Sequence, residues 1–577
     1  MNLVWNLSEL FKNEEEFLNA IDLLKKEVLE FQKNNNCDLN QDSLLYLLDE
    51  KWKLKEQANN ILVYASLNYY KDIKSEKWQE HKKLAEGLNE EVNHNLNFVD
   101  LKIIALGKDK IISFVKQNKN LETYQLYLDN LFRKQGHVLS SEDSLKVSEY
   151  NKLINEQLII YNDLINSIDY GKIEIDGEEV QITVSNYSKY LSSKNREIRK
   201  LTYETVYQSF LKYQEQFSNI LSKIISYRLE ISRIKGYNSS LEATLFEENI
   251  DSKVIDNLIK VVNNNLPLIN RFIKLKMDYL QISDPHVYDL NLSITKDLNI
   301  NYSLEEAISI IHESLKPLGE EYLKVVDLLL DGHIDASPDD KKHQSITFSW
   351  HTYSFINFRG KYLHLKNLIH EIGHIVNYYL SKQTQPYLYE DSTVFVGETA
   401  SIINEILLNH YLQNNAKTDE EKIFYLTKEI ENYLNLIFNQ TLYTELEKEY
   451  YETKSLSIDN FNQKYEEIIK KYYGNVINYD DLGTNEWIRL GHLFRWQFYS
   501  YKYATGLIIA STVVSLLESN KLTKEEYLEF LKAGSSRYSL DLLKSLKIDL
   551  TSDILSDGFK VLEEDIDKLE KILVLRR

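Results

Sequence analysis

Three residues in one short stretch have the types and spacing of a metal-dependent hydrolytic site. His370, Glu371 and His374 form the sequence H-E-x-x-H. Residues four apart share one face of a helix, so both imidazoles can bind the same ion. Glu371 lies beside that face and can take a proton from a water molecule instead of binding metal. Zinc would activate that water and polarise a carbonyl group, which is the chemistry of amide hydrolysis.

A third ligand is expected from the stretch FVGETASIINEILL, which begins at residue 395. Twenty-three residues separate His374 from Glu398, enough for one helix to end and another to begin. His370, His374 and Glu398 would give the three protein ligands and the open position of a catalytic zinc ion. Glu405 lies seven residues further along the same helical face. It is interpreted either as a hydrogen-bond acceptor for a ligand imidazole or as an exposed carboxylate.

The elements that must position these residues are mainly helical. Apolar residues recur at spacings of three and four through 8–165 and 186–330, and again from the H-E-x-x-H stretch to the C-terminus. Only 5 Pro and 17 Gly interrupt 577 residues, which favours long helices over tight turns. We therefore expect a mainly α protein with a small amount of β-structure.

Two short β-structures are predicted. Residues 171–184 alternate around Asp176-Gly177, which indicates a two-residue hairpin. The sequence SFINF at 354–358 predicts a strand ahead of the zinc helix, and the polar stretch 331–349 predicts a loop. The strand is interpreted either as an edge strand that pairs with an extended substrate or as ordinary sheet structure.

The length of the chain exceeds what one compact core usually holds, so we expect two lobes. The boundary is placed near residue 190. It divides an N-terminal helical lobe, 1–190, from a zinc-peptidase catalytic region, 191–577.

Composition excludes several classes of protein. A formal net charge of −20 argues against nucleic-acid binding, which needs a basic surface. Cys37 is the only cysteine, so an intramolecular disulfide is excluded. The N-terminus does not resemble a signal peptide, and no run of 18 apolar residues suggests a membrane span. We expect a cytoplasmic protein, and the sequence indicates no obligate protein partner.

Long stretches beyond the metal motif resemble oligoendopeptidase F, a member of the thimet-oligopeptidase group of zinc metallopeptidases. HEIGH followed by QPYLYEDSTVFVGETASIINE resembles that family's zinc helix, loop and glutamate helix. The resemblance extends nearly from end to end through the stretches 5–11, 64–72, 236–251, 498–507 and 527–553.

The resemblance implies a mostly helical, two-lobed shell with a small β-sheet beside the zinc helix. A deep channel between the lobes would admit short unfolded peptides. It implies His370, His374 and Glu398 as ligands of one zinc ion and Glu371 as the general base.

The same resemblance implies that His492, Tyr499 and Tyr503 stabilise the oxyanion and bind substrate. Because the chain contains 41 Tyr, ordinary packing is the alternative for each tyrosine.

The chain departs from the family pattern at two places. Asn377 occupies the position at which members often have a further histidine, which should leave the metal site intact. Members tend to have a glycine-rich segment ahead of the strand, whereas residues 339–355 contain no glycine. The missing glycines bring loop flexibility and closure over substrate into question.

The sequence therefore predicts a zinc-dependent endopeptidase of short peptides. One alternative is a dipeptidyl carboxypeptidase of the angiotensin-converting-enzyme type, because HEIGHIVNYYL followed by a glutamate also resembles that enzyme. Another is a catalytically idle, zinc-stabilised binding protein. The presence of Glu371 argues against the last reading, because a purely structural zinc site needs neither a base nor an open position.

Overall fold

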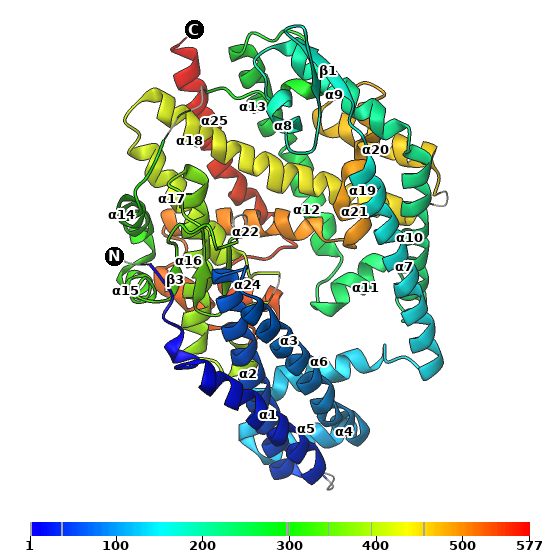
Figure 1. Cartoon of the computed structure of the whole chain (residues 1–577), viewed down its shortest axis with the longest axis vertical. Helices are drawn as coiled ribbons and strands as arrows, with labels where there is room; N and C mark the ends of the chain where they lie inside the picture. Colours follow the sequence, from blue (N-terminus) through cyan, green and yellow to red (C-terminus); the bar gives the residue numbers. More distant parts are fainter. Residues whose placement is uncertain are drawn as a thin grey trace. The chain divides into compact units, whose positions relative to one another are not determined.

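The computed structural model describes residues 3–35, 39–295, 298, 300–343, 346–393, 395–453 and 456–576. Cys37 lies outside the described residues. Helices dominate (Figure 1), which confirms the mainly α class. The strands of the described residues form one two-stranded and one three-stranded sheet.

The chain divides into two compact units, and each is discontinuous in sequence. Unit 1 comprises Met1–Val138, Ile300–Leu408 and Thr523–Leu546. Unit 2 comprises Leu139–Asn299, Asn409–Leu522 and Lys547–Arg577. The expected lobe boundary near residue 190 stays a prediction.

Unit 1 holds twelve labelled helices or parts of helices and one small sheet among its described residues. The helices are α1 (Glu14–Asn34), α2 (Gln41–Lys71), α3 (Glu76–Leu96), α4 (Phe98–Leu106), α5 (Lys108–Gln117), α6 (Gln125–Gln135), α14 (Leu304–Leu315), α15 (Glu320–Leu329), α16 (Tyr362–Lys382), the first part of α17 (Thr399–Asn414), α23 (Lys524–Lys532) and α24 (Ser539–Ser545). The strands are β3 (Ile334–Asp335), β4 (Phe348–Trp350) and β5 (Tyr353–Phe355).

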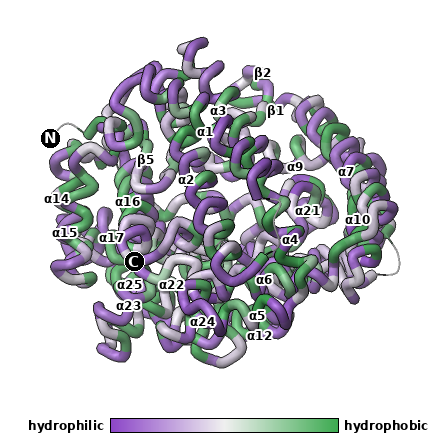
Figure 2. The backbone as a smooth tube through the Cα atoms, turned by 90° about the horizontal axis from the view of Figure 1, so that it is seen from below, coloured by the Kyte–Doolittle hydropathy of each residue, from purple (hydrophilic) through white to green (hydrophobic). Residues whose placement is uncertain are grey.

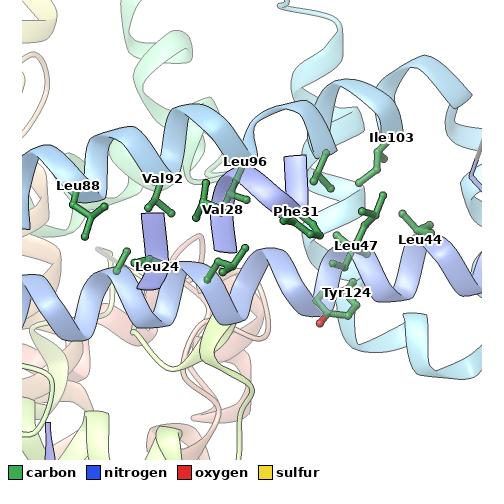
Figure 3. Packing of buried hydrophobic residues seen from close by; sticks show 14 of the residues in the cluster. Leu24, Val28, Phe31, Leu44, Leu47, Leu88, Val92, Leu96, Ile103 and Tyr124 are labelled. Carbon is green, nitrogen blue, oxygen red and sulfur yellow. The ribbon is translucent and has the colours of Figure 1, made fainter. Parts of the chain in front are cut away.

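The N-terminal helices of unit 1 form a bundle with an apolar core. Helix α1 begins after Asn13, whose side chain accepts a hydrogen bond from the Glu16 amide. Its apolar residues recur at helical spacing and are buried. Figure 3 shows Leu24, Val28 and Phe31 of α1 among residues of neighbouring helices, and the same cluster includes Leu47. The periodic pattern read from the sequence is the pattern that forms this core.

The three-stranded sheet has the order β3-β5-β4. Strand β5 pairs in parallel with β3 and antiparallel with β4. The interpretation of SFINF as an edge strand is therefore wrong, because β5 is the central strand and β4 lies at the edge. The stretch 331–349, expected to be a loop, contains β3 and the beginning of β4. Strands of two and three residues are too short to produce a recognisable alternation.

Unit 2 holds the last part of α17, the remaining helices and a β-hairpin. The helices are α7 (Ser141–Ser167), α8 (Tyr187–Leu191), α9 (Arg196–Leu211), α10 (Gln214–Ile234), α11 (Ser240–Glu247), α12 (Lys253–Asn264), α13 (Leu266–Tyr279), α18 (Asp419–Tyr433), α19 (Asn439–Glu452), α20 (Ile458–Tyr473), α21 (Gly491–Arg495), α22 (Ser500–Glu518) and α25 (Gly558–Val574). The strands are β1 (Lys172–Ile175) and β2 (Glu178–Gln181), and a π-helical segment, Leu434–Phe438, joins α18 to α19.

The predicted hairpin in unit 2 is confirmed. Strands β1 and β2 pair antiparallel, and the two residues between them are left-handed, with φ of 53° at Asp176 and 85° at Gly177. Positive φ at both positions is the requirement of a type I′ hairpin turn, for which Asp-Gly is a preferred pair.

Helix α22 is a largely buried apolar helix of unit 2 and contacts α25 and α19. It is the one helix among the described residues that is long and apolar enough to cross a membrane. However, 78% of its apolar window is buried inside the structure, as expected of a core helix. The long helices α7 and α10 instead alternate hydrophilic and hydrophobic stretches, as Figure 2 shows.

Candidate metal centre and catalytic residues

Helix α16 carries the H-E-x-x-H residues. Its first turn is capped by His364, whose Nδ1 accepts hydrogen bonds from the amides of Arg359 and Lys361 at 3.1 and 3.2 Å. Gly360 precedes the helix with φ of 77°, and a side chain there would meet the Tyr302 carbonyl. The apolar side of the helix is fully buried and consists of Leu365, Leu368, Ile369, Ile372, Ile375 and Val376. Burial of this side fixes where the two histidines point.

Three side chains in unit 1 bring their donor atoms together at this helix. The Nε2 atoms of His370 and His374 are 3.2 Å apart. The Oε2 atom of Glu398 lies 3.4 Å from the first and 3.5 Å from the second. They are the one such group of His, Cys, Asp and Glu donors among the described residues.

The spacing of these donors fits a tetrahedral metal ion. Ligand atoms about 2.0–2.1 Å from such an ion are roughly 3.4 Å from one another. Two imidazole nitrogens and one carboxylate oxygen are also a donor set that zinc accepts. The residues present therefore fit a metal ion with one coordination position left open.

A close contact between α16 and α17 brings the third side chain into place. Glu398 directly precedes α17, and its carbonyl accepts the hydrogen bond from the Ile402 amide. A Cβ atom on Gly373 would lie 2.5 Å from the Cα of Ser401. Only glycine lets the two helix backbones approach this closely. The glycine inside H-E-x-x-H thus brings the helix after Glu398 against the two histidines.

A buried chain of hydrogen bonds holds the same helices together. The Tyr322 hydroxyl of α15 donates to Oδ1 of Asn404 at 2.9 Å, and Nδ2 of Asn404 donates to the Ile369 carbonyl at 3.2 Å. Asn404 is fully buried. These hydrogen bonds therefore fix α17 against α16 at Ile369, one residue before His370.

Glu405 reaches the other nitrogen of His370. Its Oε1 lies 2.6 Å from His370 Nδ1, and its Oε2 lies 3.0 Å from the Lys366 ammonium. Although burial raises the pKa of Glu405, Lys366 and His370 outweigh burial and lower it below the ordinary range. An ionised carboxylate at Nδ1 keeps the proton there and leaves Nε2 with a lone pair for a metal.

The site is electrostatically suited to a cation. Burial disfavours a charged His370, but hydrogen bonds to Glu398 and Glu405 outweigh it and raise the pKa of His370 to about 10. Glu398 beside the two histidines has a pKa below its usual range, although burial opposes this. A metal ion would displace this proton from His370 and be stabilised by the same carboxylates, those of Glu398 and Glu405.

The carboxylate of Glu371 is held by the edge strand. Ser349 of β4 donates its hydroxyl hydrogen bond to Oε2 of Glu371 at 2.5 Å, and the same hydroxyl is 3.2 Å from the Glu371 carbonyl. Glu371 is buried, with 6% of its surface exposed, and it is not among the three clustered donors. Its orientation is thus set by a strand that the sequence pattern did not reveal.

The turn between β4 and β5 contains no glycine. His351 takes a left-handed conformation, with φ of 56°. Its ring stacks on Tyr378 of α16 with centres 4.7 Å apart, and its Nε2 lies 2.6 Å from Nδ2 of Asn59. Burial lowers the pKa of His351 to about 3, so the ring is neutral. Specific contacts thus hold this glycine-free turn.

Unit 2 gathers the other candidate residues. His492 belongs to α21, Tyr499 caps the start of α22, and Tyr503 lies one turn further. Ring centres are 5.4 Å apart for the two tyrosines and 5.8 Å apart for His492 and Tyr503. Burial, followed by Arg495, lowers the pKa of His492, which keeps its imidazole neutral near pH 7. The three side chains form one aromatic group, as helical spacing alone would not have shown.

Comparison with known proteins identifies the family. Residues 189–555 match the family model of peptidase family M3, and residues 102–167 match that of oligopeptidase F. The first match covers well over half of the chain. The chain belongs to peptidase family M3. It is therefore a metalloendopeptidase, and the resemblance read from the sequence is confirmed.

Relatives of this M3 peptidase match it over nearly its full length. Oligopeptidase PepF of Bacillus subtilis is 29% identical over 99% of this chain and 87% of the relative. An oligoendopeptidase F homologue of Borreliella burgdorferi is 28% identical, with 98% of each chain covered.

Solved structures agree with this assignment. A crystal structure of oligoendopeptidase-F from Enterococcus faecium has a TM-score of 0.70 and 25% identity and covers 98% of this chain and 100% of that one. A Chlamydophila abortus protein described as a peptidase has a TM-score of 0.93 and 26% identity, with 99% and 98% covered.

Sequence reasoning missed several residues that shape the M3 peptidase site. Ser349, Lys366 and Asn404 touch Glu371, Glu405 and the α16 backbone, respectively. Lys366 precedes His370 by four residues and so shares its helical face, a signal that was available. Ser349 and Asn404 had no such signal, because their partners lie 22 and 35 residues away in sequence. The Nδ2 atom of Asn377 donates to the Ser392 hydroxyl at 2.5 Å.

Proposed function

We propose that this M3 peptidase is a zinc-dependent endopeptidase that hydrolyses short unfolded peptides, with Glu371 as the general base. The observation that carries the proposal is the triangle of donor atoms from His370, His374 and Glu398, with edges of 3.2 to 3.5 Å. Beside it lies a carboxylate that is not one of the three donors. Three ligands, an open position and an adjacent base are the requirements of catalysis rather than of a structural site.

Each residue has a defined task in this proposal. Zinc, held by His370, His374 and Glu398, would supply Lewis-acid polarisation of the scissile carbonyl. Glu371 takes a proton from the water whose oxygen attacks the carbonyl carbon. As the C–N bond breaks, Glu371 passes this proton to the leaving nitrogen and is ionised again. The Ser349 hydroxyl holds Oε2 of Glu371 and so leaves Oε1 to exchange the proton.

The aromatic group of unit 2 completes the proposal. The Tyr499 and Tyr503 hydroxyls and the neutral His492 imidazole are N–H or O–H donors of the kind that stabilise an oxyanion. Short peptides are the proposed substrates, in keeping with the names of the oligopeptidase relatives. A cytoplasmic location is likewise proposed.

A graded pair of variants tests the role of Glu371. Glu371→Gln keeps the shape of the side chain but removes the base, so we expect a loss of at least about 10³-fold in kcat with zinc retained. Ser349→Ala removes only the hydrogen bond that orients this base, so its kcat should fall between wild type and Glu371→Gln. Peptide cleavage and bound zinc are measured on the same preparations. Equal activity of wild type and Glu371→Gln would refute the mechanism.

Dependence of cleavage on a free C-terminus separates the proposed activity from a dipeptidyl carboxypeptidase. One peptide is supplied with a free and with an amidated C-terminus. An endopeptidase cleaves both at similar rates, whereas a dipeptidyl carboxypeptidase needs the free carboxylate. A zinc-loaded protein that leaves a mixed peptide library uncut would instead be a binding protein.

A further inference from the structure

The backbone between α21 and α22 has an unusual conformation just before the candidate tyrosines. Phe498 is left-handed, with φ of 44°, although it has a bulky side chain. Its ring is buried and lies 4.9 Å from the Tyr451 ring. A bulky residue adopts this conformation only where its surroundings enforce it. Because Tyr499 follows directly, whatever fixes Phe498 also fixes the start of α22.

A buried carboxyl group holds this residue. Oε1 of Glu447, on α19, accepts a hydrogen bond from the Phe498 amide at 2.7 Å. Only 2% of the Glu447 surface is exposed. Burial raises the pKa of Glu447 to about 8, against a smaller opposing effect of the Phe498 amide and Arg228. At neutral pH the Glu447 carboxyl group is therefore protonated, and its carbonyl oxygen accepts the hydrogen bond from the Phe498 amide.

A buried guanidinium group holds the other end of the segment. Arg228, on α10, donates from Nη2 to the Phe494 carbonyl at 2.7 Å and from Nη1 to the Leu493 carbonyl at 3.3 Å. Nη1 also donates to the Tyr451 hydroxyl at 3.1 Å. These carbonyls lie at the end of α21, where the helix itself provides no donors. The two side chains thus supply opposite hydrogen-bonding groups to the two ends of Leu493–Phe498.

We propose that Arg228 and Glu447 are positioning residues that clamp the backbone of Leu493–Phe498 and thereby set the positions of His492, Tyr499 and Tyr503. The clamp spans the turn that joins the helix of His492 to the helix of the tyrosines. The effect on catalysis rests on the proposed function, because it acts through these three side chains. The hydrogen bonds themselves are independent of it.

Conservative and disruptive variants at Glu447 test the clamp. Glu447→Leu removes the acceptor, and we expect kcat for an oligopeptide to fall about 10- to 100-fold with little change in KM. Glu447→Gln keeps a neutral acceptor of the same shape and should stay within about twofold of wild type. Glu445→Gln is the matched control on the same helix, because Glu445 pairs with Lys471 instead. It should leave kcat unchanged.

Trp496 provides a readout that does not depend on activity. Its ring centre lies 5.1 Å from that of His492 and 5.8 Å from that of Tyr499. The emission of Trp496 is obtained as the difference between each protein and its Trp496→Phe counterpart. We expect this emission to change in Glu447→Leu and to match wild type in Glu447→Gln and Glu445→Gln. Unchanged emission and kcat in a folded Glu447→Leu would overturn the proposal.

A double-mutant cycle shows whether the clamp acts through the tyrosines. In a Tyr499→Phe, Tyr503→Phe background, Glu447→Leu should have little further effect on kcat. A loss as large as in wild type would overturn the claim that the clamp acts by positioning the tyrosines. Full activity of the Tyr→Phe background would instead refute the proposed role of the tyrosines, and Trp496 emission would still decide whether the clamp exists.

A variant at Arg228 covers the case in which Glu447→Leu does not fold. Arg228→Lys keeps the positive charge but cannot bridge two carbonyls in the same way. Its kcat should fall about 3- to 10-fold, with a change in Trp496 emission. Wild-type values for both quantities would overturn the proposal.

Discussion

The two groups of candidate catalytic residues are positioned in opposite ways. In unit 1, His370 and His374 lie on a regular helix whose buried side sets their direction, and other side chains bind their polar atoms. In unit 2, Tyr499 and Tyr503 follow a left-handed residue, and buried side chains bind the backbone before them. The metal-centre candidate depends on the regular spacing of one helix and its close contact with a second helix. The tyrosine region depends on a turn whose backbone is bound by side chains of other helices.

This difference predicts where each region is vulnerable. The metal-centre candidate depends on how closely α16 and α17 approach and on which side chain binds Nδ1 of His370. The tyrosine region depends on buried polar groups from α10 and α19, which are distant in sequence. Substitutions should therefore affect metal binding in the first region and the pH dependence of stability in the second.

The largest effect is expected at the contact between α16 and α17. Gly373→Ala would place a methyl group 2.5 Å from the Ser401 Cα, so the backbones must separate. We expect a loss of about 3 kcal/mol in the free energy of unfolding and weaker metal binding. Gly87→Ala is the control, since no atom lies within 4 Å of its Cβ, and this helical position should gain about 0.5–1 kcal/mol. Thermal unfolding of both variants measures the contrast, and equal behaviour would contradict the close contact.

A smaller effect is expected at the support of His370. Glu405→Leu removes the acceptor at Nδ1, and metal affinity should fall about 10- to 100-fold. Lys366→Met breaks the ion pair between Lys366 and Glu405 but leaves the hydrogen bond between Glu405 and His370. Its loss of metal affinity should therefore be much smaller. Competition with a chromophoric chelator measures both affinities. Similar losses in the two variants would show that charge around Glu405, rather than its contact with His370, is what matters.

The smallest effect is expected in the pH dependence of unit 2. The pKa of Glu447 is raised from an ordinary 4.5 to about 8 in the folded protein. Between pH 4.5 and about 8 the folded protein therefore holds a proton on Glu447 that the unfolded chain lacks. The stabilisation that this proton gives to the folded state is lost as the pH rises through about 8.

The loss between pH 7 and 8 should be about 1 kcal/mol in wild type and absent in Glu447→Gln. Arg228 and Tyr451 are ionisable groups that interact with Glu447, and both are retained in this variant. Melting temperatures across this pH range test the expectation. A constant difference between the two proteins would mean that Glu447 does not titrate there.

Much of the fold was predictable wherever one residue pattern repeats locally. The helical class and the Asp176-Gly177 hairpin follow from periodicity and turn chemistry. The short strands β3 and β4 were not predictable, and the central place of β5 was mistaken for an edge. Strand order depends on pairing between segments far apart in the chain, which no local pattern records.

The sequence by itself determined the metal-binding motif and the family. Helical spacing puts His370 and His374 on one face, and the family-model match over residues 189–555 places the chain among the M3 peptidases. Only the tertiary structure decided how Glu398 and Glu405 meet these histidines, that Ser349 holds Glu371, and that Glu447 and Arg228 hold the segment before Tyr499. Spacing within a helix is fixed by local geometry, whereas the packing of distant elements depends on contacts that form only when the whole chain folds.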